Sequence, residues 1–476
     1  MSRLLVYGVG PRPHPGATKI HAPGLRLQTI AQALAEDGHE VTIIEHTFGN
    51  AADAPPVPPP PGVERAIALA PIGQSALGKQ WYGEINDRPY DGVVALTDLA
   101  EWLAAMLWTK DTPLFVDYFG HPMAERQMQA HTGDNDAALL GMWRNVLPVL
   151  LRSDAFGVCS RAQRLALIGE LGAAGRLNRH TTGYEFAHVL RPALPFSEPW
   201  THSTPGQPYL RGPVVPPGAR VILSTGGFNT WLDEKTLFEA TDHVLADDPD
   251  AHFVATGGAI SGHVESVYHR FEERVAASPH RERYHLLGWV PHERFVDACL
   301  EADLGVTCDV PTLEGEFGCR NRLFGWLWAG MRAVAADFSE LTQDMAAQGL
   351  ITTAAPQKPK ALAAAMRRDL ARGRLDRAAA AQRRQTLVGH FSPAKCYEPL
   401  LRWARDPKKA PDLRDGAPAD NPLARAQHAY WIQHGEANAL PEFLDRVEGS
   451  RLLRWWMKRN PDAARLFRRL RARDHS

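Results

Sequence analysis

The sequence is poor in cysteine and has no long apolar run. Its 476 residues contain five cysteines, at positions 159, 299, 308, 319 and 396. Their spacing fits neither a disulfide framework nor a zinc site. No stretch reaches the ~18 apolar residues of a membrane span, and the apolar run in the N-terminal "MSRLLVYGVG" is too short for a signal peptide. These absences favour a soluble protein of a reducing compartment, and we expect the cytoplasm.

The chain also lacks an excess of charge of either sign. Lysine and arginine number 53 against 54 aspartates and glutamates, which gives a formal net charge of −1. A chain with this balance is not built to coat a nucleic acid, and we expect no nucleic-acid partner. Hydrophobic residues make up 44% of the sequence, which is typical of globular proteins. The length exceeds that of one core and fits two domains with an appendage.

Two series of short apolar segments alternate with amphipathic helical segments. The first series begins at Leu4–Tyr7, and a helix is predicted from Leu25 to the glycine at position 38. The second series begins near Ala219 with "ARVILSTGGFN", followed by a predicted helix over 233–245. This alternation predicts an α/β fold in which each half contains a parallel sheet covered by helices on both faces.

The residues between the two series are rich in proline and follow no regular period, which indicates a linker. Two parallel-sheet domains that face each other bind their ligand in the cleft at the carboxyl ends of the strands. The predicted boundaries are a first Rossmann-like domain over 1–195, a linker over 196–218, a second such domain over 219–384, a crossover helix over 385–405 and a basic helical extension over 406–476.

Three segments of the second half, in this order, resemble retaining glycosyltransferases of family 4, which have the GT-B fold. They are "ILSTGGFNTWLDEKTLFEA", "LGWVPHERF" and "CRNRLFGWLWAGMRAVAADFSEL". In the first half, "SDAFGVCSRAQRLALIGELGAAGR" is similar to a bacterial branch linked to surface polysaccharides. The resemblance covers roughly residues 1 to 400. It implies transfer of a sugar from a nucleoside diphosphate donor to an unidentified glycan, lipid-linked or small-molecule acceptor, with retention of configuration and without a metal or other cofactor.

Gly226 and Gly227 lie where a predicted strand turns into a helix. Glycines there let backbone N–H groups approach a diphosphate, and the helix dipole would stabilise its charge. A plain tight turn is the alternative. Lys235 could add a positive charge or could be a solvated lysine of the first turn. The resemblance assigns the nucleotide base to Trp289 and Val290, although Trp289 could also be ordinary core.

The stretch "EGEFGCRNRLFGWLWAGM" combines carboxylates and guanidiniums at the start of an apolar helix. We expect Glu314 or Glu316, in a loop before that helix, to accept hydrogen bonds from the hydroxyls of the donor sugar. Arg320 and Arg322 would neutralise the leaving diphosphate. A solvated charged loop over a core helix is the alternative. The resemblance implies a second glutamate that binds the ribose, but Gly325 occupies that position.

The first half supplies the candidates for the acceptor side. His121 follows a predicted strand, and the resemblance implies that it lies near the reacting sugar carbon. Asp117 ends the same strand. Gly8, Gly10 and Lys19 belong to the first glycine loop and would line the acceptor side. That loop has no clean G-x-G-x-x-G pattern, which argues against a dinucleotide cofactor.

The stretch 451–476 holds nine Lys or Arg residues, two aspartates and several large apolar residues. It could contact an anionic membrane surface peripherally, or it could form a helix that docks on the first domain. Two other functions stay open from the sequence: a sugar-nucleotide epimerase of similar fold, and a noncatalytic partner subunit that retains the fold.

Overall fold

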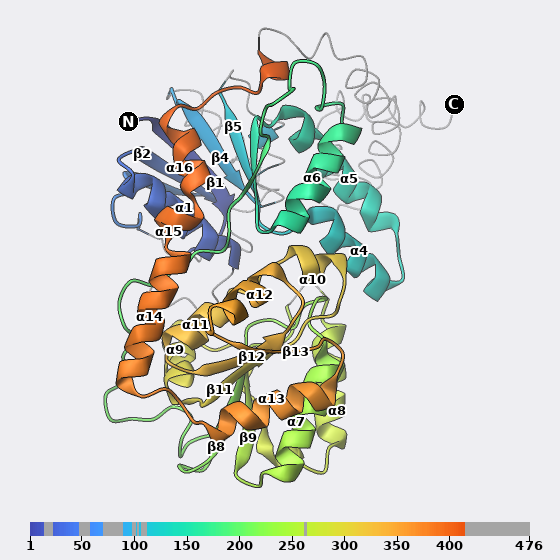
Figure 1. Cartoon of the computed structure of the whole chain (residues 1–476), viewed down its shortest axis with the longest axis vertical. Helices are drawn as coiled ribbons and strands as arrows, with labels where there is room; N and C mark the ends of the chain where they lie inside the picture. The colour runs from blue at the N-terminus through green and yellow to red at the C-terminus, as the bar shows by residue number, and fades with distance from the viewer. Residues whose placement is uncertain are drawn as a thin grey trace, which may run out of the picture. The chain divides into compact units, whose positions relative to one another are not determined.

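The structure, a computed structural model, contains two parallel sheets that follow one another along the chain (Figure 1). Two compact units are present, residues 1–169 with 185–410 and residues 170–184 with 411–476, and both sheets belong to the first. The described residues are 1–13, 22–46, 58–69, 89–97, 101, 104–105, 112–260 and 264–414.

The first sheet has seven strands in the described residues, in the order β3-β2-β1-β4-β5-β6-β7, and every printed pairing is parallel. Its central strands are buried almost throughout, which explains their nearly continuous apolar sequence. Two short strands, β3 and β7, were not predicted from the sequence. The strands are β1 (Arg3–Val9), β2 (Glu40–His46), β3 (Arg65–Leu69), β4 (Gly92–Leu96), β5 (Leu114–Tyr118), β6 (Ala155–Val158) and β7 (Ala187–Val189).

The second sheet has six strands in the described residues, in the order β10-β9-β8-β11-β12-β13, again all parallel. The order reverses between β8 and β11, just as it does between β1 and β4 in the first sheet. Ligands of such sheets bind beyond the carboxyl ends of the strands at this reversal. The strands are β8 (Arg220–Thr225), β9 (Ala251–Thr256), β10 (Tyr284–Leu286), β11 (Leu304–Thr307), β12 (Arg332–Ala336) and β13 (Thr352–Ala354).

The connections within each sheet contain most of the helices. The first half has α1 (Ala22–Glu36), α4 (Pro122–Gly133), α5 (Ala137–Arg152) and α6 (Arg161–Ala173). The second half has α7 (Glu234–Asp247), α8 (Ser266–Ala277), α9 (His292–Glu301), α10 (Leu313–Phe317), α11 (Arg322–Trp328), α12 (Glu340–Ala347), α13 (Pro359–Ala371) and the 3₁₀ turn η2 (Arg281–Arg283).

The region 385–405, predicted as one crossover helix, is divided into three helices. The first, α14, ends at Phe391 because Ser392 precedes a proline and adopts an extended conformation, with ψ of 145°. A residue before proline is sterically excluded from the helical region. The chain continues as α14 (Arg377–Phe391), α15 (Pro393–Cys396) and α16 (Glu398–Arg405).

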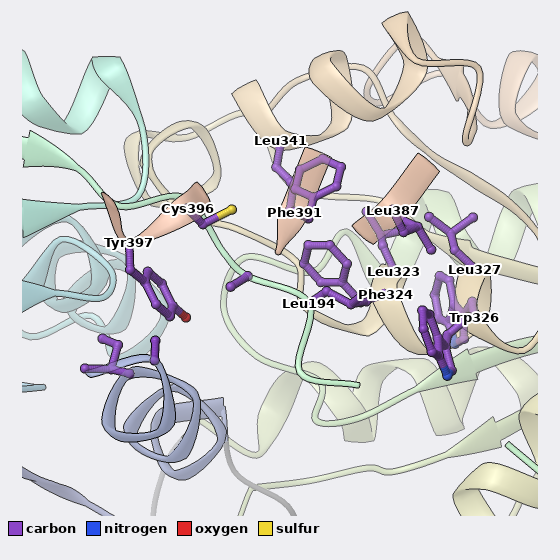
Figure 2. Close-up of a cluster of buried hydrophobic side chains, with 14 of the residues drawn as sticks. Leu194, Leu323, Phe324, Trp326, Leu327, Leu341, Leu387, Phe391, Cys396 and Tyr397 are labelled. Atoms are coloured by element: carbon purple, nitrogen blue, oxygen red, sulfur yellow. The ribbon is translucent and has the colours of Figure 1, made fainter. Parts of the chain in front are cut away.

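Helix α11 is anchored in a hydrophobic cluster that includes the linker and α14 (Figure 2). Its residues Leu323 to Trp328 are buried, as the apolar sequence predicts. Phe324 meets Phe391 of α14 edge to face, with ring centroids 5.3 Å apart. This packing holds the first residue of α11, Arg322, in a defined place.

The second unit is described only over residues 170–184 and 411–414. A buried ion pair joins its two segments, because Arg176 Nε lies 2.7 Å from Asp412 Oδ2. None of the described helices is long and apolar enough to cross a membrane. The basic stretch 451–476 lies outside the described residues, so the choice between its two interpretations stays open.

We expect truncation of Phe391 to destabilise the first unit strongly. The ring is fully buried, and Phe391→Ala should cost about 3–5 kcal/mol through lost burial and the cavity left behind. Val388→Ala, one turn earlier on the same helix, is the control because Val388 is 46% exposed. Urea titration followed by tryptophan fluorescence measures both, and equal midpoints for the two variants would contradict the packing described here.

Candidate functional site

A cavity of about 640 Å³ lies where several strands of both halves end. This volume is within the usual range for small-molecule sites. Its lining comes from the segments that follow β5, β8 and β11, from the start of α1 and from the linker. The lining combines two guanidiniums, two carboxyl groups and several aromatic rings, namely Arg320, Arg322, Glu125, Glu314, Phe119, Phe196, Trp231, Trp289 and Phe295.

The glycine pair after β8 lines the cavity, as the sequence suggested. Gly226 has φ of +82°, a conformation that favours glycine. Gly257, after β9, lies so close that a Cβ atom on it would be 2.1 Å from the carbonyl oxygen of Gly226. The two loops therefore meet backbone to backbone. Beside Gly227 the nearest side chain is that of Ile260, which a Cβ atom at this position would meet at 2.6 Å.

The positive N-terminal end of the dipole of helix α7 was expected directly after these glycines, but the helix does not begin there. It begins several residues later, and its first turn is capped by Asp233, whose carboxylate accepts a hydrogen bond from Thr236 N at 3.0 Å. Lys235 is exposed, lies 3.9 Å from Glu239 and is not part of the cavity lining. The positive charge of the site therefore comes from other residues.

Arg320 and Arg322 provide that charge, and Trp231 holds both of them. The guanidinium of Arg320 lies 3.9 Å from the centre of the Trp231 ring, and that of Arg322 lies 4.8 Å from it. Arg320 Nε also pairs with the buried Asp309 Oδ2 at 2.8 Å. Arg322 Nη2 donates to the carbonyl oxygen of Gly227 at 3.1 Å. The arginines are thus joined to the loops after β8 and β11.

The arginine cluster has an excess of positive charge and unsatisfied donors. Burial lowers the pKa of Arg322 to about 10, so this side chain stays charged at pH 7. Burial raises the pKa of Asp309, and Arg320 opposes that shift. Within the described part of the chain, the buried atoms Arg320 Nη2 and Arg322 Nη1 have no hydrogen-bond partner. Buried guanidinium donors of this kind suit an anionic ligand.

Glu314 faces the cavity, whereas Glu316 is exposed and lies outside the lining. The segment that carries them is the short helix α10 rather than the loop that we expected. Thr312 caps it by accepting a hydrogen bond from Gly315 N. Glu314 accepts a hydrogen bond from Thr230 Oγ1 at 2.9 Å. Burial, reinforced by the nearby Glu125, raises the pKa of Glu314 to about 8.

His121 lines the cavity from the first half and lies next to α10. Its ring is 5.1 Å from that of Phe317. Its Nδ1 accepts a hydrogen bond from Ala124 N at the start of α4, which places the proton of the neutral ring on Nε2. Burial lowers the pKa of His121 to about 4. Gln163 orients this loop, because its amide donates to the carbonyl oxygens of Tyr118 and Gly120.

The other described residues expected on the acceptor side do not line the cavity. Asp117 is fully buried and forms a double hydrogen bond with Arg26, at 2.7 and 2.8 Å. Gly8 and Gly10 instead permit close packing: a Cβ atom on Gly8 would meet Leu27, and one on Gly10 would meet Glu45. Lys19 lies outside the described residues. The described lining here consists of Pro13, Ala22, Pro23, Leu25 and Gln28.

Trp289 and Val290 do line the cavity, and Trp289 Nε1 donates to the carbonyl oxygen of Ala259 at 2.8 Å. Gly325 also lines it. Four residues that shape the site were not predicted from the sequence: Thr230, Trp231, Asp309 and Gln163. Thr230 and Trp231 follow the glycine pair closely and Asp309 follows a predicted strand, but nothing in the sequence identified their partners. No group of residues able to hold a metal ion occurs in the described ranges.

No protein-family model matches the sequence, and no curated protein matches it either. Solved structures do match its fold. The sucrose-phosphate synthase of Thermosynechococcus elongatus superposes with a TM-score of 0.61 and 15% identity, over 85% of this chain and 98% of that one. The chain has the GT-B fold.

Two further structures give the same result. The α,α-trehalose-phosphate synthase (UDP-forming) of Burkholderia vietnamiensis has a TM-score of 0.59 and 14% identity, over 85% of this chain and all of that one (100%). The Anabaena protein HepE, in complex with UDP and glucose, has a TM-score of 0.54 and 13% identity, over 84% of this chain and 98% of that one. At these identities the likeness establishes the fold.

The raised pKa of Glu314 predicts a pH-dependent contribution to stability. Between the ordinary pKa of a glutamate and about 8, the folded state keeps a proton that the unfolded state releases. Stability is therefore lost as the pH rises through this window, by at most about 5 kcal/mol. Glutamine at position 314 does not titrate, so Glu314→Gln does not lose stability in this way. The unfolding free energy of the variant minus that of the unmodified chain should therefore increase from pH 5 to pH 8.

Urea titrations at several pH values measure this difference. Glu316→Gln is the control, because its side chain is exposed and lies outside the cavity lining. Parallel pH profiles for Glu314→Gln and the unmodified chain would show that the carboxyl group is ionised in the folded state.

Proposed function

We propose that this chain is a glycosyltransferase that moves a sugar from a nucleoside diphosphate donor to an acceptor bound by the first half. One observation carries the proposal. The guanidiniums of Arg320 and Arg322 each have a buried donor atom without a partner in the described structure, and Arg322 is hydrogen-bonded to Gly227 of the glycine pair. Such a group of donors fits the two phosphates of a nucleoside diphosphate.

The arginines would act chiefly when the bond to the sugar breaks, because the leaving diphosphate then gains negative charge. Fixed positive groups stabilise such charge strongly, since they are already oriented and screened from water. We propose that they replace a metal ion in this role. Two solved neighbours support a donor of this class: one is a UDP-forming synthase, and another is a complex with UDP and glucose.

The sugar would lie between Glu314 and His121. Both side chains are uncharged at pH 7, since the pKa of Glu314 is about 8 and that of His121 is about 4. They can therefore exchange hydrogen bonds with sugar hydroxyls without repelling the leaving anion. Glu314 replaces Glu316 in this role because only Glu314 faces the cavity. We leave Lys235 out of the donor site.

As in family 4, which the sequence resembles, we propose that the anomeric configuration is retained and that the diphosphate helps to deprotonate the acceptor. The chain would then contribute orientation of the two substrates and stabilisation of the departing charge. The described acceptor side contains Pro13, Leu25 and Phe119 together with His121. We assign no acceptor beyond the classes that the sequence suggested.

The donor proposal predicts a specific loss of binding in Arg322→Ala. Removing one charged hydrogen-bond donor should weaken the binding of the best nucleoside diphosphate in a panel by ~1.5–3 kcal/mol. Isothermal titration calorimetry in the presence of EDTA measures this affinity and tests whether a metal is needed. Arg281→Ala is the control, since Arg281 is 63% exposed and lies outside the cavity. Equal affinities for both variants would exclude the phosphate role.

The two neighbouring glutamates provide a second test. Glu314→Ala should reduce turnover of the full sugar nucleotide by about tenfold, because it removes the hydrogen bonds of the uncharged carboxyl group to the reacting sugar. Its affinity for the bare diphosphate should not change. Glu316→Ala should leave both quantities unchanged. If Glu316→Ala alone lowers turnover, the assignment is wrong; if the unmodified protein binds the diphosphate but transfers nothing, it is a noncatalytic binding protein.

A further inference from the structure

Two of the five cysteines meet where the two halves of the first unit come together. Cys159 follows β6 in the first half, and Cys319 follows α10 in the second half. A hydrogen bond joins their thiols. The neighbouring residues also touch, because Ser160 Oγ donates to the carbonyl oxygen of Phe317 at 3.4 Å, across 157 positions of sequence. We call Cys159 and Cys319 the thiol pair.

The thiol pair can be reached from the cavity. Cys319 and Gly120 both line the cavity. The backbone N–H of Gly120 donates a hydrogen bond to the Cys159 thiol. Cys159 is buried, whereas Cys319 is partly exposed. A small molecule in the cavity therefore approaches the pair from the side of Cys319.

The surroundings of the thiol pair favour loss of one proton. The hydrogen bond from the Cys319 thiol lowers the pKa of Cys159, and the Arg26 guanidinium adds to this shift, while burial and Asp117 oppose it. The same hydrogen bond raises the pKa of Cys319. Cys159 is therefore the group that ionises first, and Cys319 keeps its proton. A thiolate next to a second thiol is the arrangement that oxidises readily to a disulfide.

The other three cysteines differ from the thiol pair. Cys299, Cys308 and Cys396 are all buried. Burial raises the pKa of each of these thiols, so they stay protonated at neutral pH. Buried thiols of this kind react slowly with oxidants. An oxidant should therefore select the thiol pair.

We propose that Cys159 and Cys319 form a reversible disulfide, which fastens the first half to the second half beside the cavity. In the reducing compartment that the sequence favours, such a bond is transient and responds to oxidants. Because Arg320 directly follows Cys319, the disulfide also restrains the segment that carries this arginine. The inference goes beyond the proposed function and does not depend on it.

Hydrogen peroxide is an oxidant small enough to enter the cavity. The Cys159 thiolate attacks one peroxide oxygen, the O–O bond breaks, and the hydroxide that leaves takes the proton of the Cys319 thiol to become water. The Cys319 thiolate then attacks the sulfur of the resulting sulfenic acid, which forms the S–S bond and releases a second hydroxide that solvent protonates. The two sulfurs lose two electrons, which reduce the peroxide. A dithiol such as dithiothreitol returns two electrons and two protons and restores both thiols.

Thiol titration of the unmodified full chain tests the inference. After treatment with hydrogen peroxide and unfolding in urea, the number of titratable thiols should fall from five to three, and dithiothreitol should restore all five. Mass mapping of peptides without reduction should find Cys159 linked to Cys319. Five thiols after peroxide, a different linkage, or a loss that dithiothreitol does not reverse would each overturn the inference.

A matched pair of variants tests the specificity of the link. Cys319→Ser should form no disulfide under the same treatment. Cys396→Ser removes a thiol outside the pair, so it should form the link between Cys159 and Cys319 as fully as the unmodified chain does. A disulfide of equal yield in Cys319→Ser overturns the inference. If either variant does not fold, the peptide map of the unmodified chain decides.

The disulfide should also make the folded chain harder to unfold. A bond between positions 159 and 319 closes a long loop and so removes conformational freedom from the unfolded state. The urea midpoint of the oxidised chain should therefore be higher than that of the reduced chain, and Cys319→Ser should show no such increase after peroxide. An equal or lower midpoint in the oxidised chain shows that the bond forms only by distorting the fold, and it overturns the proposed link between the folded halves.

Discussion

The donor end of the cavity depends on the buried ion pair between Arg320 and Asp309. Removing such ions from water costs several kcal/mol each, and close pairing is needed to offset that cost. Asp309 follows β11 and Arg320 precedes α11, so their 2.8 Å contact ties the segment containing α10 to the end of the sheet. Trp231 covers both guanidiniums from the loop after β8. Because Asp309 pairs with Arg320, the charge of Arg322 stays available to a ligand.

The two halves contribute different chemistry to the cavity. The second half supplies both guanidiniums and the glycine pair, at the ends of the two strands where the order of the sheet reverses. The described lining from the first half is mostly apolar, and burial keeps His121 neutral at pH 7. In the proposed transfer, negative charge develops on the leaving diphosphate, which lies against the second half. The guanidiniums of that half can stabilise this charge.

The sequence predicted the sheets well because buried parallel strands have a local signature. Long apolar runs such as β1 and β8 are recognisable without knowledge of their neighbours. The strands β3, β7 and β13 contain three to five residues and have no distinct pattern, so they were missed. The crossover region was predicted as one helix, although Pro393 in the sequence was a signal for its interruption.

In the candidate site, the sequence by itself determined the glycine turn, the two arginines and the apolar helix behind them, because each follows from adjacent residues. The tertiary structure decided which charged groups reach the cavity. Glu314 and Glu316 are two positions apart, and within α10 such residues point to different sides, so only Glu314 faces inward. Asp117 is withdrawn from the site by Arg26, a partner 91 positions away. Pairing over such distances depends on how the elements pack, and adjacent residues do not encode it.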